Sequence, residues 1–257
     1  MIAVISDIHS NVAALKAVLA DIDRRGAERV VCLGDVLGYG PEPRECLDLV
    51  MSRSHVTLMG NHDFAVLFEP NNFNAVAEAA CYWTRAELER ETDKARRDAR
   101  WDYLGAAPVK HTISGADYGL GPLAFVHASP RRPVNEYVFP DDIFNNAGKV
   151  AGCFDRFEQL CFVGHTHVPG VFLGTPDFYA PDELDGVYEA DPQHKALINV
   201  GSVGQPRDRD PRASYVLIEQ GQVRFLRVEY DIESVAGKIR RQPELDNFLG
   251  TRLFDGR

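Results

Sequence analysis

Short apolar runs recur along the chain, and each one stops abruptly at polar residues. The runs cover residues 3–6, 30–33, 56–59, 123–126 and 160–163. Runs of this length are typical of strands that are buried on both faces of a sheet. In open α/β sheets, ligands gather at the carboxyl ends of the strands, so these run ends predict a functional site.

The residues that follow the runs are of types that bind metal ions or transfer protons. They are Asp7, His9, Asp35, Asn61, His62, Asp63, His127, His165 and His167. A single aspartate or histidine is most often a cap, surface or core residue, but the coincidence at successive run ends favours one shared site. We also expect Asp7 and His9, and likewise His165 and His167, to leave the strand on the same side, because residues two apart in a strand share a face.

A helical period separates the first two runs and predicts a βαβ unit. Asn11 is of a type that caps helices, and Gly26 is of a type that ends them. The apolar residues between them fall on one helical face and are Val12, Leu15, Leu19 and Ile22. A strand–helix–strand unit of this kind pairs its two strands in parallel.

Residues 64–105 change character and predict a helical cap or insertion beside the site. One helical stripe there contains Val76, Ala79, Ala80, Trp83 and Leu88. The alternating charges of residues 87–100 indicate a solvated helix face.

From about residue 109 the pattern turns to strands. Residues 111–114 and 123–126 predict a hairpin, and later strands are expected at 196–200, 214–218 and 223–228. The apolar tail from Leu245 is expected to pack on the body or to meet a partner chain. With no linker-like run in the sequence, we predict an α/β fold in which residues 1–257 form a single domain.

Composition narrows the classes of partner. The 257 residues carry a net charge of −10, which disfavours binding to a nucleic acid polymer, since such binding needs a basic surface. The five cysteines are scattered and form no Cys-x-x-Cys pair, which favours a reducing compartment. With no signal-like segment and no apolar run of about 20 residues, we expect a cytoplasmic protein without a membrane span.

The predicted ligand atoms suggest which metals would bind. Carboxylate, imidazole and amide oxygen together suit manganese, iron or zinc rather than calcium, and the absence of cysteine from the motifs argues against structural zinc. There are more ligands than one ion takes, so we expect two divalent ions with a bridging carboxylate. Paired metals about 3.5–4 Å apart suit in-line displacement at phosphorus.

The motifs as a set resemble the calcineurin-like metallophosphoesterase family. They are Asp7-x-His9, Gly34-Asp35, Gly60-Asn-His-Asp63, His127 and Gly164-His-x-His167, in the order of the family. Residues 201–207 extend the likeness toward the small bacterial and archaeal phosphodiesterases related to diadenosine tetraphosphatase.

The resemblance implies a fold, a reaction and a set of roles. The fold would be a four-layer α-β-β-α sandwich of two mixed sheets flanked by helices. Asp7, His9, Asp35 and His167 would hold one metal, and Asp35, Asn61, His127 and His165 would hold the second. Asp35 would therefore bridge two ions, with manganese first and iron or zinc as alternatives. His62 would act on the leaving oxygen or the transferring phosphoryl group while a hydroxide between the metals attacks in line.

The sequence departs from the protein phosphatases of this superfamily. The residues after Gly34-Asp35 lack the Asp-Arg-Gly extension, so no carboxylate that orients His62 is identified and a protein phosphatase is disfavoured. The arginines expected to contact substrate phosphate are Arg131, Arg132 and Arg207, because a guanidinium matches phosphate oxygens.

Several functions stay open at this point. The first is hydrolysis of a small phosphodiester or dinucleoside polyphosphate. The alternatives are a phosphomonoesterase or protein phosphatase, a nuclease, and a non-catalytic metal-binding interaction module on the same fold. The filled catalytic positions disfavour the module, and the acidic charge disfavours the nuclease. The sequence leaves open whether a second copy of the chain binds.

Overall fold

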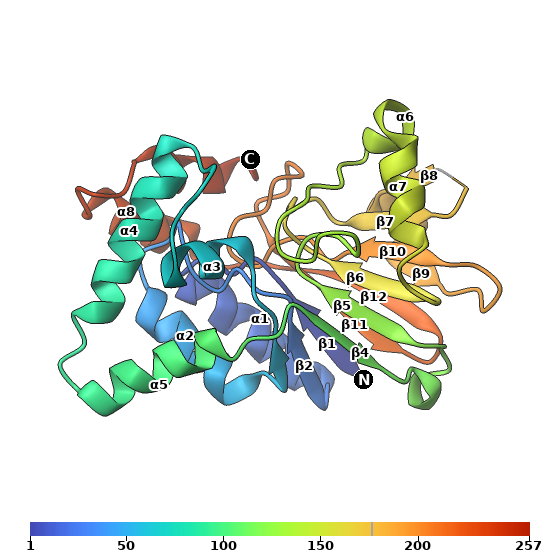
Figure 1. Cartoon of the computed structure of the whole chain (residues 1–257), viewed down its shortest axis with the longest axis horizontal. Coiled ribbons are helices and arrows are strands. Elements are labelled where there is room, and N and C mark those ends of the chain that lie inside the picture. Colours follow the sequence, from blue (N-terminus) through green and yellow to red (C-terminus); the bar gives the residue numbers. More distant parts are fainter. Residues whose placement is uncertain (176) are drawn as a thin grey trace.

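The computed structural model describes residues 1–175 and 177–257, and within these ranges it contains two six-stranded mixed sheets (Figure 1). The first sheet begins with three parallel strands and ends with three antiparallel ones. In spatial order its strands are β3 (Val56–Thr57), β2 (Arg29–Cys32), β1 (Ile2–Ile5), β11 (Ala213–Glu219), β12 (Gln222–Val228) and β9 (Val187–Glu189).

The second sheet has a parallel centre and antiparallel edges. In spatial order its strands are β4 (Lys110–Ile113), β5 (Leu123–Val126), β6 (Leu160–Val163), β10 (Ala196–Asn199), β7 (Gly170–Leu173) and β8 (Asp177–Tyr179).

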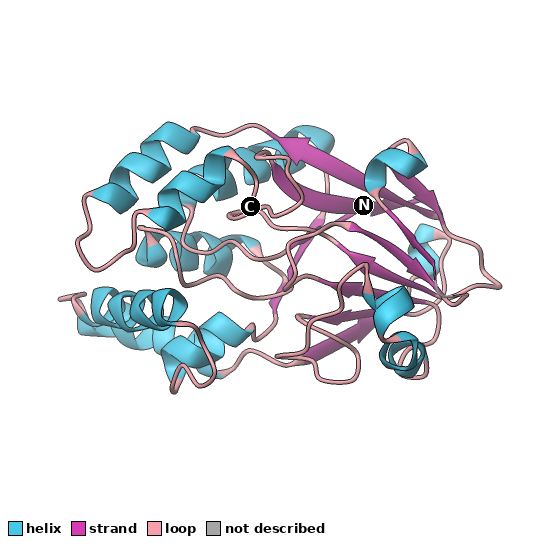
Figure 2. Ribbon diagram, turned by 90° about the horizontal axis from the view of Figure 1, so that it is seen from above, coloured by secondary structure: helices cyan, strands magenta, loops and turns pink. Residues whose placement is uncertain are grey.

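Helices flank the pair of sheets (Figures 1 and 2). The outer face of the first sheet packs against α1 (Val12–Arg25) and α2 (Pro43–Arg53), and that of the second against α6 (Asp142–Asn145) and α7 (Ala147–Phe154). The other helices are α3 (Asn61–Leu67), α4 (Ala75–Glu89), α5 (Lys94–Gly105), α8 (Ile232–Arg240) and α9 (Phe248–Thr251), with 3-10 turns η1 (Ala116–Tyr118), η2 (Pro181–Leu184) and η3 (Arg252–Phe254). The predicted four-layer α/β architecture is confirmed.

Strand β1 shows why the layers form. Its residues are all buried, but alternate side chains enter different cores, because successive side chains in a strand point to opposite faces. Ile2 and Val4 pack between the two sheets, whereas Ala3 and Ile5 pack under the helices. An unbroken apolar run is therefore what a strand between two apolar layers requires.

The predicted local elements are largely confirmed. Strands β1 and β2 pair in parallel across α1, whose cap is Asn11 and whose end is Gly26 at a left-handed φ of 72°. Strands β4 and β5 form the predicted hairpin, with η1 in its connection. Each helix in the described ranges is too short or too polar to cross a bilayer.

The helical region at 64–105 differs in detail from its prediction. It contains α4 and α5 and most of α3, and Ala79 is exposed because α4 turns Ala80 and Trp83 toward the C-terminal segment instead. The charged stretch is also not wholly solvated. Arg100 is buried and binds Asp48 through two nitrogens, with Glu91 as a further partner.

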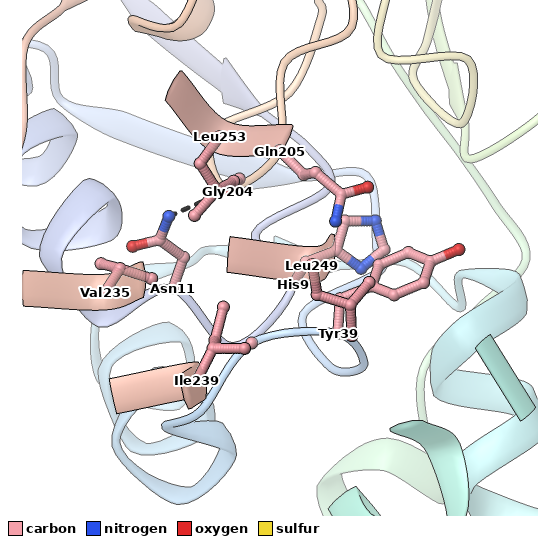
Figure 3. Close-up of a pocket in the computed structure, with 10 residues that line it drawn as sticks. His9, Asn11, Tyr39, Gly204, Gln205, Val235, Ile239, Leu249 and Leu253 are labelled. Carbon is pink, nitrogen blue, oxygen red and sulfur yellow. Dashed lines mark hydrogen bonds between the residues drawn. The ribbon is translucent and has the colours of Figure 1, made fainter. Parts of the chain in front are cut away.

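The C-terminal tail packs back on the body, which is one of the two outcomes expected for it. Leu249 and Leu253 lie beside α8 and close one side of the loops that carry His9 and Tyr39 (Figure 3). The space left between them is about 10 Å³, room for no more than a water molecule.

Shortening Leu253 to alanine should therefore lower the free energy of unfolding by about 2–5 kcal/mol, because a buried leucine side chain leaves a cavity. Leu253 is 3% exposed, whereas the adjacent Phe254 is 44% exposed. Phe254→Ala is the matched control and should change stability by about 0.5 kcal/mol or less. Urea unfolding of both variants measures the two changes in the free energy of unfolding. If both changes are small and equal, the tail does not pack as described.

Candidate metal centre

The loops after β1, β2, β5 and β6, together with the start of α3, bring the predicted ligands into one buried cluster. In the described part of the chain the donor atoms form three groups, and the atoms of each group lie within 4.8 Å of one another. The groups are Asp7, His9 and His167; Asp35, His127 and His165; and His9, Asp35 and His62. Asn61 joins the second group through a 3.1 Å contact between its Oδ1 and His127 Nε2. Asp35 stands in two of these groups, and its Oδ2 lies 3.7 Å from Nε2 of His9 and 3.4 Å from Nε2 of His127, residues that are predicted to bind different ions.

The backbone that carries these side chains is left-handed. The prediction that Asp7 and His9, and likewise His165 and His167, continue an extended strand was therefore wrong. The left-handed residues are Asp7 (φ 53°), His9 (φ 48°), Asp35 (φ 50°), His165 (φ 65°) and His167 (φ 62°). Left-handed φ is uncommon outside glycine and costs energy, so it persists only where the surroundings fix it. The fixing contacts include backbone hydrogen bonds from Asp7 to Gly34 and from His9 to Asp35, both 3.0 Å.

The Nε2 atoms of His9 and His167 face each other, and neither of them carries a proton. Nδ1 of His9 lies 3.0 Å from the carbonyl oxygen of Leu37, and Nδ1 of His167 lies 2.6 Å from that of Gln205. A carbonyl only accepts hydrogen bonds, so Nδ1 carries the proton in both neutral rings. Their Nε2 lone pairs then face each other at 3.1 Å.

The carboxylate of Asp7 adds a third acceptor beside these two nitrogens. Its Oδ1 is 3.2 Å from Nε2 of His167 and is buried without a hydrogen-bond partner. Three lone pairs that converge without a donor repel one another unless a cation lies between them. The residues present therefore fit a metal ion.

The second group has the same character. Oδ2 of Asp35 is 3.4 Å from Nε2 of His127, and Nε2 of the buried His165 has no partner. Burial alone would lower the pKa of His127, but Asp35 and Asp7 raise it to about 9. The carboxylates thus favour positive charge at His127, and a bound cation would supply that charge in place of the proton.

Burial keeps the other rings neutral. The pKa of His62 is lowered to about 4 chiefly by burial, and that of His165 to about 3 by burial and by the neighbouring His127. Burial acts to raise the pKa of Asp7, but His167 and His127 hold it well below its usual range. Neutral imidazoles beside ionised carboxylates are the protonation states that bind divalent ions.

His62 lies at the start of α3, where its backbone N–H donates to Oδ1 of Asp35 at 2.8 Å. Its ring packs against Tyr39, with centroids 4.4 Å apart, and edge-on against Phe73 at 4.8 Å. Among the described residues no carboxylate hydrogen-bonds this ring; its Nδ1 instead lies 3.6 Å from Sγ of Cys81. The part of the chain that the structure describes therefore does not supply a carboxylate that orients His62.

Asp63 holds two of the site's backbone segments together through hydrogen bonds. Its carboxylate accepts hydrogen bonds from the backbone N–H groups of Val36, Leu37 and Gly60. Burial and the nearby Asp35 raise its pKa to about 7. Asp63 thus joins the Asp35 loop to the start of α3, and a Cβ at Gly60 would collide with Asp35.

The predicted arginines are not equally placed. Arg207 hydrogen-bonds the side chain of Gln205 at 2.7 Å, and its guanidinium lies 5.8 Å from the ring of Tyr39. Its charge helps to lower the pKa of His62, after burial and against the opposing effect of Asp35. Arg131 instead approaches Glu136 at 3.6 Å and the backbone of α7, while Arg132 is exposed. Only Arg207 is thus tied to the cluster by these contacts.

A cleft of about 100 Å³ opens beside His62 and Asn61. Its other lining residues are Tyr39, Asn72, Phe73, Asn74, Ala77, Asn135 and Tyr137. Tyr137 stacks on His165 with centroids 3.9 Å apart. Tyr39 and Tyr137 were not predicted as site residues, because each lies in a loop without a motif and reaches the site only through tertiary packing.

Comparison with known proteins agrees with this geometry. The profile of the calcineurin-like phosphoesterase superfamily domain matches residues 1–222. An uncharacterized protein of Methanocaldococcus jannaschii is 38% identical over 267 residues, covering 100% of this chain and 98% of that protein. The crystal structure of a metallophosphoesterase from Sphaerobacter thermophilus is 38% identical, covers 100% of this chain and 98% of its own, and superposes with a TM-score of 0.81. A hypothetical protein from Pyrococcus horikoshii OT3, at 19% identity with 100% and 99% coverage and a TM-score of 0.75, shares the fold.

Proposed function

The chain belongs to the calcineurin-like phosphoesterase superfamily and is a metal-dependent phosphoesterase, and on that premise we propose that it is a dinuclear phosphodiesterase of small substrates. The observation that carries the proposal is the position of Asp35, whose Oδ2 lies 3.7 Å from Nε2 of His9 and 3.4 Å from Nε2 of His127, between the two groups of ligands. We place the enzyme in the cytoplasm, which suits its five free, buried thiols.

We divide the ligands between two ions as the family resemblance implies. Asp7, His9 and His167 would hold one ion and Asn61, His127 and His165 the other, with Asp35 between them. We propose manganese, since mixed carboxylate, imidazole and amide donors suit it, with iron and zinc as alternatives. Bound metals would supply Lewis acidity toward the phosphoryl oxygens and a nucleophile at neutral pH.

The protein's own groups orient and stabilise the reacting ester. His62 is held at the edge of the cleft, where its free ring nitrogen can donate to the leaving oxygen or to the phosphoryl group. The guanidinium of Arg207 supplies a charged donor pair for the remaining oxygens. Its hydrogen bonds go to the Gln205 amide, and in residues 1–175 and 177–257 no carboxylate neutralises it.

The size and charge of the surroundings favour a small ester. The cleft is about 100 Å³, and its walls are aromatic rings and amide side chains rather than a row of cations. A polymer needs a basic track along its backbone, which a chain of net charge −10 does not suggest. An organic group next to one phosphate, as in an aryl diester or a dinucleoside polyphosphate, suits these walls.

Direct competition between substrates tests this proposal. With manganese present, bis(p-nitrophenyl) phosphate and a dinucleoside tetraphosphate should be hydrolysed faster than p-nitrophenyl phosphate, a phosphopeptide or single- and double-stranded DNA. Preference for the monoester or phosphopeptide would replace the phosphodiesterase by a phosphomonoesterase or protein phosphatase. Faster, steeply salt-dependent cleavage of long DNA would make the protein a nuclease.

Arg207→Ala should raise KM for the small diester by about 10–100-fold with a smaller change in kcat. A hydrogen bond to a charged group contributes about 1.5–3 kcal/mol, and binding shared by substrate and transition state appears in KM. Arg131→Ala is the matched control, because Arg131 is held by Glu136, and its KM should stay within about twofold. A larger effect at Arg131 than at Arg207 would exchange their roles.

A further inference from the structure

We propose that Cys81 is the positioning residue of His62, so that a thiol on α4 takes the place of the missing carboxylate. This inference rests on the proposed function, because it assigns His62 a role in the reaction. It also gives the helical region at 64–105 a specific task, since that region supplies the group that fixes the ring.

The contact is direct and buried. Sγ of Cys81 lies 3.6 Å from Nδ1 of His62, within hydrogen-bond reach for sulfur. Cys81 is 1% exposed and His62 is 4% exposed, so water does not compete for this nitrogen. In the described ranges no other group hydrogen-bonds the ring, and Nδ1 is therefore assigned to Cys81, while Nε2 is left for the substrate.

The packing around the ring makes this assignment specific. Phe73 and His9 approach the ring edge-on, with centroids 4.8 Å and 4.9 Å away. Gly38 borders Nδ1 so closely that a Cβ there would collide with the ring. The aromatic and backbone contacts thus fix the position of the His62 ring. The hydrogen bond to the thiol then fixes its orientation, with Nδ1 toward α4.

A thiol suits this position better than a carboxylate would. Burial, helped by Asp35 and Asp63, raises the pKa of Cys81 to about 12, so the group stays a neutral thiol. A thiol is a weak donor and a weak acceptor, and it can bond Nδ1 whether or not that nitrogen carries a proton. A carboxylate would add a further buried negative charge beside Asp35 and Asp63.

The test compares Cys81→Ala and Cys81→Ser on two diesters, one with a p-nitrophenyl and one with a phenyl leaving group. The alanine variant should lower kcat for the phenyl ester by about three- to tenfold, as expected for one lost hydrogen bond, and have less effect on the better leaving group. KM and metal content should be unchanged. Serine, which restores a donor and acceptor, should recover most of the rate.

Cys46→Ala is the matched control, because it removes another fully buried thiol, on α2. It should leave the ratio of the two rates unchanged. A Cys81→Ala variant with unaltered rates on both esters, or one that slows both equally and loses metal, would overturn the inference and make Cys81 a packing residue.

Nitrogen-15 NMR of the histidine rings separates this inference from the proposed function. The His62 Nδ1 resonance, identified by its absence in His62→Ala, should shift in Cys81→Ala and return toward its place in Cys81→Ser. This readout needs no substrate. A wild-type protein inactive on every diester would overturn the proposed function alone, whereas an unmoved Nδ1 resonance would overturn the role of Cys81 alone.

Discussion

Asp35→Asn should reduce kcat for the diester by about 10³-fold or more and lower the bound metal from two ions per chain to one. Lewis-acid stabilisation by a metal is worth several kcal/mol, and each 1.36 kcal/mol is a factor of ten in rate. Asparagine keeps the shape of the side chain and its acceptor for the His62 N–H, but it removes the charge that faces His9 and His127 at 3.7 Å and 3.4 Å.

Elemental analysis and steady-state kinetics on the same samples measure both effects. Asp98→Asn is the matched control, since it removes one carboxylate from the solvated side of α5, where it pairs with Lys94. It should retain full activity and both ions. If Asp35→Asn keeps two ions and the wild-type rate, Asp35 does not bridge.

His62→Ala should lower kcat by about 10²–10⁴-fold while both metals remain bound, which is the range that general acid–base catalysis supplies. The alternative is that His62 is a ligand, because its ring lies with His9 and Asp35 in one group of donor atoms. The catalytic role is favoured by the place of His62 on the wall of the cleft, because a group that acts on the leaving oxygen must reach the substrate.

Metal content distinguishes the two roles. A His62→Ala variant that loses metal in proportion to activity would make His62 a ligand, and a fully active variant would remove it from the mechanism. His194→Ala is the control, because His194 is exposed and its one side-chain partner among the described residues is Asp191. It should behave as the wild type in both measurements.

Local pattern predicted the strands, the α/β class and the residues that gather at the cluster, whereas the four-layer arrangement was implied by the family resemblance. Apolar runs such as Ile2–Ile5 predict strands buried on both faces, and the residues after them lie where strand ends meet. The assignment of individual roles within the cluster remains a prediction that the variants above test.

Other features depend on tertiary contacts that no local pattern encodes. The sequence around Asp7 and His165 is compatible with an extended strand, and nothing in it indicates their left-handed backbone. That conformation is accompanied by a tertiary contact, the 2.9 Å hydrogen bond from the His165 N–H to the Asp7 carboxylate. Cys81 reads as one more core position of a helix, and only the packing of α4 on α3 brings it to His62. Ala79 was misplaced because a helical stripe fixes an angle only to within a residue.

Metal titration of the hydrolysis of bis(p-nitrophenyl) phosphate tests the central claim most directly. Protein freed of metal by a chelator should be inactive, and added manganese should restore the rate until it levels off at two bound ions per chain, as measured by elemental analysis of the same samples. Hydrolysis that persists without metal, or that reaches its plateau at a single bound ion, would contradict the dinuclear phosphodiesterase proposed here.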